Sequence, residues 1–290
     1  MDRYAVAGEE PAGTQAPPRV SARDVWGLVA TPGPPRAGRP SIQFGAEDMT
    51  GGGARQRRFD IDLGDHLVPG LLWTPAEGEG PWPLVLMGHG GSGSKREPHI
   101  VALGRRLARE HGIAAAAIDG PVHGDRRTDT DAPPALVLVE FAQLWANDGD
   151  AMTDAMVADW QATLDALTAL GEVRSDAIGW WGVSMGAITG VPVVAADARV
   201  RAAVLGLMGT TGPTRVRIEQ DAPSIRCPVL FLVQSDDAMF PRESALALFD
   251  TLGSPDKRLH LHPGGHGDVP GEAFEESAHF LATRLSETRR

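Results

Sequence analysis

The serine in the segment Gly182-Val183-Ser184-Met185-Gly186 has the surroundings of a nucleophile. An apolar run at residues 177–183 predicts a strand before it, and the run at 186–195 predicts a helix after it. The two glycines leave room for a sharp strand-to-helix turn that would hold the hydroxyl above the sheet. The N–H of Met185, at the start of that helix, could donate to a developing oxyanion. The G-x-S-x-G pattern alone occurs by chance, but its place between a strand and a helix makes it specific.

A serine hydroxyl is a weak nucleophile unless a base removes its proton and an acid orients that base. His266 follows a predicted strand at 258–261 in the glycine-rich loop Pro263-Gly264-Gly265-His266-Gly267, so it is the candidate base. Asp236 and Asp237 follow the predicted strand at 228–233, where an orienting acid would stand. One of these two aspartates is expected to be a turn former instead.

A fourth loop, His89-Gly90-Gly91-Ser92-Gly93, follows the predicted strand at 83–87. In a serine hydrolase this early loop supplies the second oxyanion N–H, here that of Gly91. His89 and Ser92 are then candidates for substrate contact. From Gly88 onward the loop also matches G-x-G-x-x-G, so a nicotinamide-dependent oxidoreductase is an alternative. That alternative leaves Ser184 and His266 without a role.

The elements that would position these residues alternate along the chain. The hydrophobic pattern predicts strands at 57–63, 66–73, 83–87, 113–118, 177–183, 200–205, 228–233 and 258–261, and helices at 99–110, 151–170, 186–195, 242–252 and 272–286. Apolar strands between helices indicate an α/β fold, a mostly parallel sheet of about eight strands with helices on both faces. The first two strands form a hairpin around Gly64-Asp65. In such a sheet, ligands bind beyond the carboxyl ends of the strands.

Residues 1–55 are rich in proline and glycine and predict an N-terminal arm, with a helical turn or two at 23–29. Residues 56–290 form the predicted catalytic domain. The arm is expected to extend over this domain; an arm that covers a pocket or reaches a second subunit is the alternative.

Composition excludes several classes of protein. The formal net charge of −11 argues against a nucleic-acid partner, which needs a basic surface. A single cysteine, Cys227, excludes an internal disulfide and a four-cysteine zinc site. We expect no bound metal, because no carboxylate or cysteine cluster accompanies His260, His262 and His266 in the sequence. The chain has neither a spanning apolar run nor the pattern of a signal peptide, so no membrane contact and a cytoplasmic location are expected.

Together these motifs resemble the α/β-hydrolase fold, and the chain is most similar to the dienelactone-hydrolase-like and acyl-peptidase-like esterases. The resemblance covers about residues 57–288 and rests on the H-G-G loop, the G-x-S-x-G elbow and the late histidine, in the order serine, acid, histidine. It implies Ser184 as nucleophile and His266 as base. It favours Asp237 over Asp236 as the acid, because the family often has a proline four residues later, here Pro241. Dienelactone hydrolases proper use cysteine as nucleophile, so their specific reaction is not implied.

The sequence indicates less about the substrate pocket than about the catalytic residues. Residues 208–226 are too few for a large cap over the site, whereas extra length lies between His123 and Asp150. That insertion contains apolar residues such as Trp145 and predicts one short helix, which would form a wall of an apolar pocket or only pack against the helix at 151–170. His123 and Trp145 are therefore candidates for substrate contact, and for His123 a structural cluster of hydrogen bonds and ion pairs with Asp119, Asp125 and Arg126 is the alternative.

The sequence thus predicts a cofactor-free serine hydrolase acting on a carboxylic ester of a small or medium organic molecule, through an acyl-enzyme on Ser184. A thioesterase, a lactonase or a peptidase or amidase would use the same residues, because fold and triad do not choose the substrate. A non-catalytic binding protein on a hydrolase scaffold is a further alternative. The sequence leaves the oligomeric state open.

Overall fold

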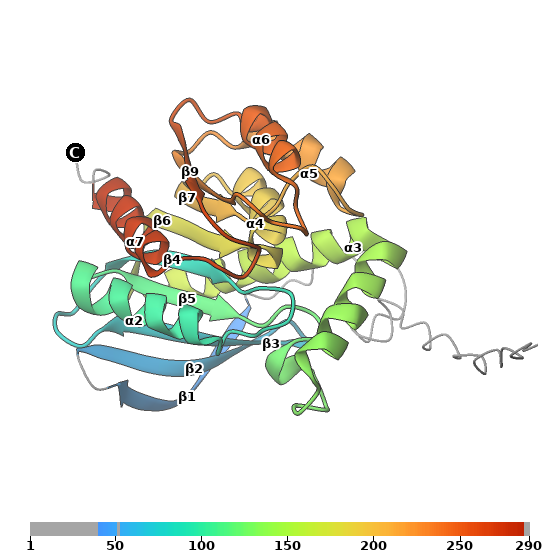
Figure 1. The fold of residues 1–290 in the computed structure, drawn as a ribbon. Coiled ribbons are helices and arrows are strands. Elements are labelled where there is room, and N and C mark those ends of the chain that lie inside the picture. Colours follow the sequence, from blue (N-terminus) through green and yellow to red (C-terminus); the bar gives the residue numbers. More distant parts are fainter. Residues whose placement is uncertain (1–39, 51–52, 287–290) are drawn as a thin grey trace, which may run out of the picture.

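The computed structural model describes residues 40–50 and 53–286, and these form one nine-stranded sheet with helices on both faces (Figure 1). The strands are β1 (Ser41–Thr50), β2 (Ala54–Asp62), β3 (Leu67–Pro75), β4 (Trp82–Gly88), β5 (Ala114–Ile118), β6 (Val173–Val183), β7 (Val200–Gly206), β8 (Val229–Gln234) and β9 (Lys257–His262). The helices are α2 (Pro98–His111), α3 (Pro134–Ala169), α4 (Met185–Ala196), α5 (Arg215–Asp221), α6 (Arg242–Thr251) and α7 (Gly271–Ser286), with 3-10 turns at Gly124–Arg126 and Ala222–Ser224. The predicted α/β class is confirmed.

The sheet is antiparallel at one edge and parallel elsewhere. Its strand order is β1-β2-β3-β5-β4-β6-β7-β8-β9, and every pair from β5-β4 onward is parallel. The predicted hairpin is present as β2 and β3, which pair antiparallel from Ala54–Pro75 to Asp62–Leu67. The carboxyl ends of β4, β5, β6 and β8 therefore meet at one edge of the sheet, which is where the candidate residues were expected.

Strand β1 lies within the range that the sequence assigned to the arm. Residues 41–50 pair antiparallel with β2 and make it an inner strand, with a register shift between Phe44 and Glu47. The expected helical turn at 23–29 lies outside the described residues. Short helix α5, at Arg215–Asp221, also had no counterpart among the expected elements.

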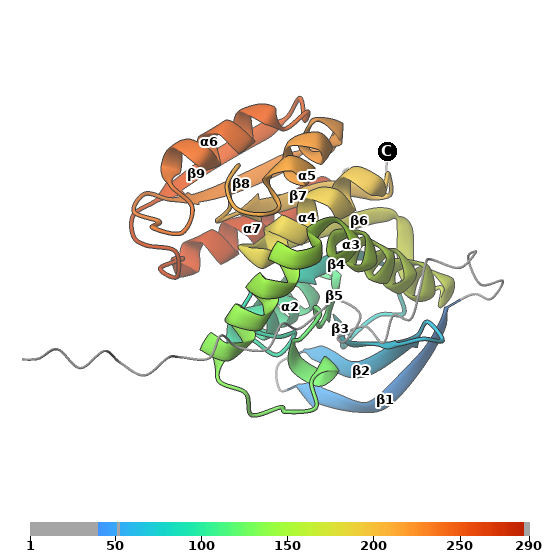
Figure 2. The same ribbon diagram turned by 90° about the vertical axis from the view of Figure 1, so that its right-hand side faces the viewer.

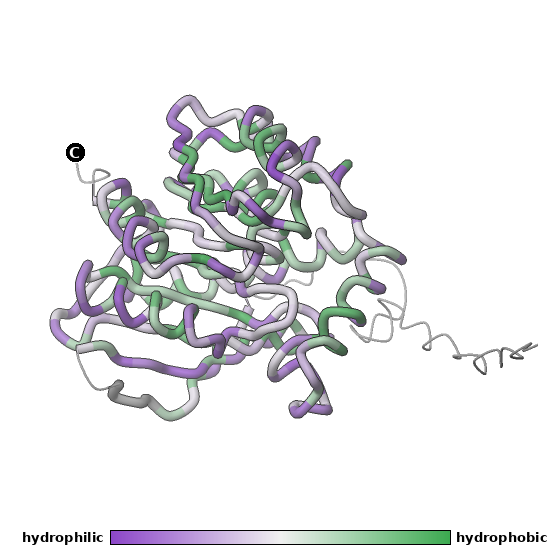
Figure 3. Tube along the Cα trace, in the orientation of Figure 1, coloured by the Kyte–Doolittle hydropathy of each residue, from purple (hydrophilic) through white to green (hydrophobic). Residues whose placement is uncertain are grey.

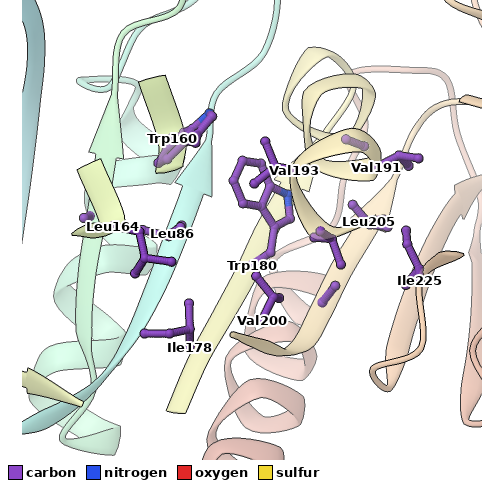
Figure 4. Close-up of a cluster of buried hydrophobic side chains, with 14 of the residues drawn as sticks. Leu86, Trp160, Leu164, Ile178, Trp180, Val191, Val193, Val200, Leu205 and Ile225 are labelled. Atoms are coloured by element: carbon purple, nitrogen blue, oxygen red, sulfur yellow. The ribbon is translucent and has the colours of Figure 1, made fainter. Parts of the chain in front are cut away.

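Alternating side chains of the strands fill two separate cores. In β4, Leu84 and Leu86 belong to the core shared with α3, α4, α5 and α6, whereas Val85 and Met87 belong to the core shared with α2 and α7. This period of two follows from the pleat of a strand. Figure 2 shows the two helical layers edge-on, and Figure 4 shows the first core around Trp180. Along the trace, hydrophobic residues gather in the central strands and on the inward sides of the helices (Figure 3).

Helix α3 is longer than the sequence predicted, because the short helix of the insertion runs directly into the long helix after it. The two parts meet at a kink where Asp148 has non-helical angles, φ −154° and ψ 48°, just before Gly149. The bend carries the first part of α3 toward the carboxyl ends of the strands (Figure 2). There Phe141, Leu144 and Trp145 pack with Met185 in a third buried cluster. None of the described helices is long and apolar enough to cross a membrane.

Candidate active site

The turn between β6 and α4 holds Ser184 in a conformation that few L-residues adopt. Ser184 has φ 55° and ψ −125°, and its N–H donates to the carbonyl of Gly206 at 2.9 Å. A Cβ at Gly186 would lie only 2.2 Å from the carbonyl oxygen of Gly88, so a glycine is needed for α4 to start this close to β4. The local structure is the strained strand-to-helix elbow that the sequence predicted.

Three predicted residues from different strand ends meet at this elbow. His266 Nε2 lies 2.9 Å from Ser184 Oγ, and His266 Nδ1 lies 2.7 Å from Asp237 Oδ2. Both distances are those of hydrogen bonds between a nucleophile, a base and an orienting acid. The Asp237 side chain is 2% exposed, and the His266 side chain is 25% exposed, so the base faces both the protein and the open side of the site.

The structure separates the two aspartates that the sequence left as rivals. Asp237 accepts the N–H groups of Met239 and Phe240 through Oδ1 at 2.8 and 2.9 Å, which leaves Oδ2 for His266. Asp236 instead accepts the hydroxyl of Ser235 at 2.7 Å. Asp237 therefore both closes the turn at residues 237–240 and contacts the imidazole, whereas the contact of Asp236 is with the adjacent Ser235.

The two candidate oxyanion donors lie side by side. An ideal Cβ built on Gly91 would be 3.7 Å from the Cβ of Met185, so the two backbones approach closely beside Ser184. Met185 is the first residue of α4, so no carbonyl of a preceding helical turn accepts its N–H. Backbone N–H groups of this kind can bind the negative charge of a tetrahedral intermediate.

His89 was a candidate for substrate contact, and the structure corrects this, because its side chain is buried and bonded to backbone on both sides. It is 1% exposed. Its Nδ1 lies 2.8 Å from the carbonyl of Gly90, and its Nε2 accepts the N–H of Gly120 at 2.9 Å. The accepted hydrogen bond places the ring proton on Nδ1, which then donates to Gly90. The Gly90 carbonyl belongs to the same peptide as the Gly91 N–H, so His89 orients the candidate oxyanion donor.

Burial is the main cause, and the neighbouring His123 the second, of a pKa of His89 that is lowered to about 3. The folded protein therefore holds this imidazole neutral at pH values where an unfolded chain would protonate it. Stability is full near neutral pH and falls as pH drops from about 6.5 toward 3, because the unfolded state then binds a proton that the folded state refuses. This residue alone should cost about 3 kcal/mol of unfolding free energy between pH 7 and pH 4.

Urea unfolding at both pH values would measure this. We expect the loss to be smaller by about 3 kcal/mol in His89→Gln, which cannot titrate, even if that variant is less stable at pH 7. His279→Gln, which changes an exposed histidine of α7, should keep the wild-type pH dependence. An equal loss in wild type and His89→Gln would mean that His89 is not held neutral.

Behind the oxyanion loop lies a buried network of charges. Lys95 is 0% exposed, its ammonium donates to Asp119, and it also reaches Asp125 at 2.8 Å. The N–H of Lys95 donates to Asp119 Oδ1 at 2.9 Å. The guanidinium of Arg96 donates to both carboxylate oxygens of Asp125, with N–O distances of 2.7 and 3.0 Å. Together with Lys95, Arg96 holds the pKa of the Asp125 carboxyl well below its usual range. The network fastens the loop after β4 to the loop after β5.

The same network argues against the dinucleotide interpretation of this loop. Asp119, the acid that would bind a ribose, is buried and committed to Lys95. Helix α2 starts only at Pro98, so its N-terminus does not directly follow Gly93 as in the dinucleotide-binding fingerprint.

The remaining candidates for substrate contact, His123, Trp145 and Ser92, differ in how deeply they are buried. His123 is 0% exposed and its Nε2 lies 2.9 Å from the Gly91 carbonyl, so it supports the loop from within, and burial lowers its pKa. Trp145 is buried against Phe141, with ring centroids 4.4 Å apart. Both side chains are buried, which favours their structural alternatives over contact with a substrate. Ser92 is exposed on the loop.

Two further apolar side chains lie near the site, one in the insertion that the sequence predicted as a pocket wall and one that the sequence did not single out. Leu138, in the first part of α3, is 37% exposed, and its Cδ1 would lie 3.2 Å from a Cβ on Gly91. The ring of Phe240 lies 5.7 Å from that of His266. Both residues follow long or irregular connections, and only their apolar type within the insertion or after the acid was visible in the sequence.

Comparison with known proteins agrees with this geometry. The model of the dienelactone hydrolase family matches residues 68–270. A cold-adapted esterase from an Arctic intertidal metagenomic library, solved with polyethylene glycol bound, is 39% identical and superposes with a TM-score of 0.73, over 83% of this chain and 98% of that one. The acetyl xylan esterase of Paenibacillus sp. R4 shares the fold, with a TM-score of 0.63 and 17% identity over 84% of this chain and 89% of its own.

A match among curated proteins is more limited. Uncharacterized protein YnbC of Escherichia coli K12 is 33% identical over 87 residues, which cover 28% of this chain. The chain spans only 15% of the length of that protein, so the likeness is confined to part of it.

Proposed function

This chain belongs to the dienelactone hydrolase family, and on that premise we propose that it is a serine hydrolase that cleaves carboxylic esters of small or medium organic molecules through an acyl-enzyme on Ser184. The observation that carries the proposal is the chain of contacts from Ser184 Oγ to His266 Nε2 and from His266 Nδ1 to Asp237 Oδ2. The esterase that is 39% identical over nearly all of its length supports ester hydrolysis. A cytoplasmic location, expected from the sequence, is part of the same proposal.

The first half-reaction forms the acyl-enzyme. His266 Nε2 takes the proton of Ser184 as Oγ attacks the carbonyl carbon of the ester. Asp237 accepts the Nδ1–H of His266, which fixes the tautomer and stabilises the imidazolium that forms. The N–H groups of Met185 and Gly91 bind the oxyanion of the tetrahedral intermediate. Collapse of this intermediate breaks the bond to the alcohol oxygen, which takes the proton from His266.

The second half-reaction releases the acid. A water enters where the alcohol left, His266 Nε2 takes one of its protons, and the hydroxide oxygen attacks the acyl carbonyl. A second oxyanion forms between the same two N–H groups. Its collapse returns the proton to Ser184 Oγ and frees the carboxylic acid, so the enzyme ends in its initial protonation state. Every step uses groups of this chain.

A panel of p-nitrophenyl esters, thioesters and anilides, combined with a fluorophosphonate probe, tests the proposal. We expect turnover of the esters and a stoichiometric adduct on the peptide that holds Ser184, with loss of turnover in proportion to labelling. A folded protein that neither reacts with the probe nor hydrolyses any ester would support the binding-protein alternative. Turnover of thioesters or anilides with little ester turnover would move the proposal to those reactions.

The exposed apolar side chains of α3 bear on which esters fit. Leu138 stands beside Gly91, and Phe141, behind it, contacts the cluster that contains Met185. An acyl or alcohol chain that leaves the oxyanion position toward α3 would lie against Leu138. In this proposal the first part of α3 packs on the domain and also forms an apolar wall of the substrate pocket. The two roles that the sequence left open for the insertion, packing and pocket wall, are therefore compatible.

Leu138→Ala should therefore lower the preference for longer chains, because it removes the apolar surface against which they would lie. We expect the ratio of kcat/KM for octanoate over acetate esters to change by about tenfold, since a methylene in an apolar pocket is worth about 1–3 kcal/mol. Val139→Ala removes a neighbouring exposed side chain on another face of the helix and should leave this ratio within about twofold. A chain-length profile that does not change in Leu138→Ala would exclude α3 from the binding site.

A further inference from the structure

Two histidines and a glutamate come together where β9 meets α7, at the edge of the sheet opposite β1. Leu259 packs against the core on the α4 side, so the alternate residues His260 and His262 face α7 on the other side. Glu276 projects from α7, and its Oε2 lies 2.6 Å from Nδ1 of His260. One donor atom from each of these three side chains lies within 4.8 Å of the other two.

The sequence analysis set aside a metal site at these histidines because no carboxylate accompanied them. That reason is wrong, because Glu276 is remote in the sequence but adjacent in the fold. The grouping with His266 is also corrected, since His266 is engaged with Ser184 and Asp237. The structure therefore divides the three histidines into a pair at the edge of the sheet and one at the elbow.

A second observation indicates that a ligand binds at His260 and His262. Nε2 of His262 is buried, and nothing in the part of the chain that the structure describes gives it a hydrogen bond. A buried imidazole nitrogen without a partner is uncommon, because burial removes the water that would otherwise bond to it. An imidazole on an edge strand, packed beside a second imidazole and a carboxylate, has the donor type that transition metals bind.

We propose that His260, His262 and Glu276 form a binding site for a divalent transition metal, with Zn²⁺ as the best match. Two imidazoles and one carboxylate are an established zinc donor set, and three protein ligands leave a fourth position for water. Bonds of about 2.1 Å in a tetrahedron place donor atoms about 3.4 Å apart, so small side-chain rotations within the cluster suffice.

The surroundings permit a cation here. His260 and Glu276 line an open surface cleft of about 320 Å³, which gives water and the ion access. Arg258 and Arg284 line the same cleft, and both pair with Asp256, whose single negative charge offsets one of the two positive charges. The overall charge of −11 also favours a cation. Imidazole ligands should select Zn²⁺, Co²⁺ or Ni²⁺ over Mg²⁺ and Ca²⁺, which prefer oxygen.

Calorimetric titration of the full chain with Zn²⁺, and with Co²⁺ for its visible absorption, tests the site. We expect one equivalent to bind, with a tetrahedral Co²⁺ spectrum, and a Tm rise of roughly 5 °C at a hundredfold excess over Kd. The double variant His260→Ala/His262→Ala should lose binding, and Glu276→Gln should weaken it at least tenfold. His279→Ala, in the same cleft, and Glu275→Gln, the adjacent carboxylate, should bind as wild type does.

Three results would overturn the proposal. The first is a wild-type protein that binds neither Zn²⁺ nor Co²⁺ at millimolar concentration. The second is binding that survives in the double variant but disappears in His266→Ala, which would place the metal at the triad. The third is an octahedral Co²⁺ spectrum that His279→Ala abolishes. Since all three readouts measure binding and not turnover, they are independent of the esterase proposal.

Discussion

Replacing Ser184 by alanine should lower the kcat of ester hydrolysis by about 10⁶-fold. The variant loses the Oγ that would form the acyl-enzyme, and His266 Nε2 loses the proton donor 2.9 Å away. What remains is the catalysis by the two oxyanion N–H groups and by substrate binding, which in a serine hydrolase is about 10³–10⁴-fold over water. Initial rates with a p-nitrophenyl ester, corrected for spontaneous hydrolysis, measure the change.

The substitution should leave the fold intact, because alanine keeps the Cβ and the backbone of the elbow already holds a non-glycine residue at φ 55°. We expect the Tm to stay within about 3 °C of wild type. Ser235→Ala is the matched control, since it removes a hydroxyl that follows β8 and bonds to Asp236. A Ser184→Ala protein that is folded and retains a tenth of the wild-type activity would exclude Ser184 as the nucleophile.

Asp237→Asn should lower kcat by about 10⁴-fold, whereas Asp236→Asn should change it only a few-fold. An asparagine can keep the acceptor for Met239 and Phe240, which preserves the turn, but it then presents its amide N–H₂ to His266 Nδ1. The imidazole would be driven into the tautomer with its proton on Nε2, where it cannot take the serine proton.

The activities of the two variants can be compared directly, because Asp236 and Asp237 are adjacent, carry the same charge and are both replaced by asparagine. Circular dichroism and Tm should show both variants folded. The expected ratio of their activities is about 10³ or more. A larger loss in Asp236→Asn would transfer the role of acid to Asp236. Equal losses would mean that the turn, and not the contact with His266, is what the aspartates supply.

The sequence predicted the elements whose signal is local. Strands of continuous apolar residues such as β4 and β6 were found because burial on both faces leaves no polar alternation. The hairpin β2–β3 was found from its turn at Gly64-Asp65. The elbow was found because glycine, strand and helix signals coincide at Ser184. In each case the burial pattern or turn that determines the element involves only about ten consecutive residues.

What the sequence missed depends on contacts between distant residues. Strand β1 carries charged residues and is stabilised by pairing with β2, which no pattern within 41–50 announces. Asp237 was preferred to Asp236 only through the family resemblance, because two adjacent aspartates do not themselves indicate which carboxylate the turn directs at His266. His89 looked like a substrate contact because its loop lies at the site, whereas the Gly120 N–H, 31 residues away, draws the ring inward. Glu276 reaches His260 only because α7 packs beside the edge strand.

The three residues of the proposed triad lie late in the chain, and the proposed base, His266, is the last of them. Ser184 follows a central strand, whereas His266 lies 82 residues later, after the edge strand β9 and just before α7, which packs on β4, β6 and β7. Because a chain is synthesised from its N-terminus at about 5–20 residues per second, the nucleophile and its elbow leave the ribosome seconds before the base does. A nascent or prematurely terminated chain that ends before His266 lacks both the proposed base and α7, so it could neither cleave esters nor cover this face of β4, β6 and β7.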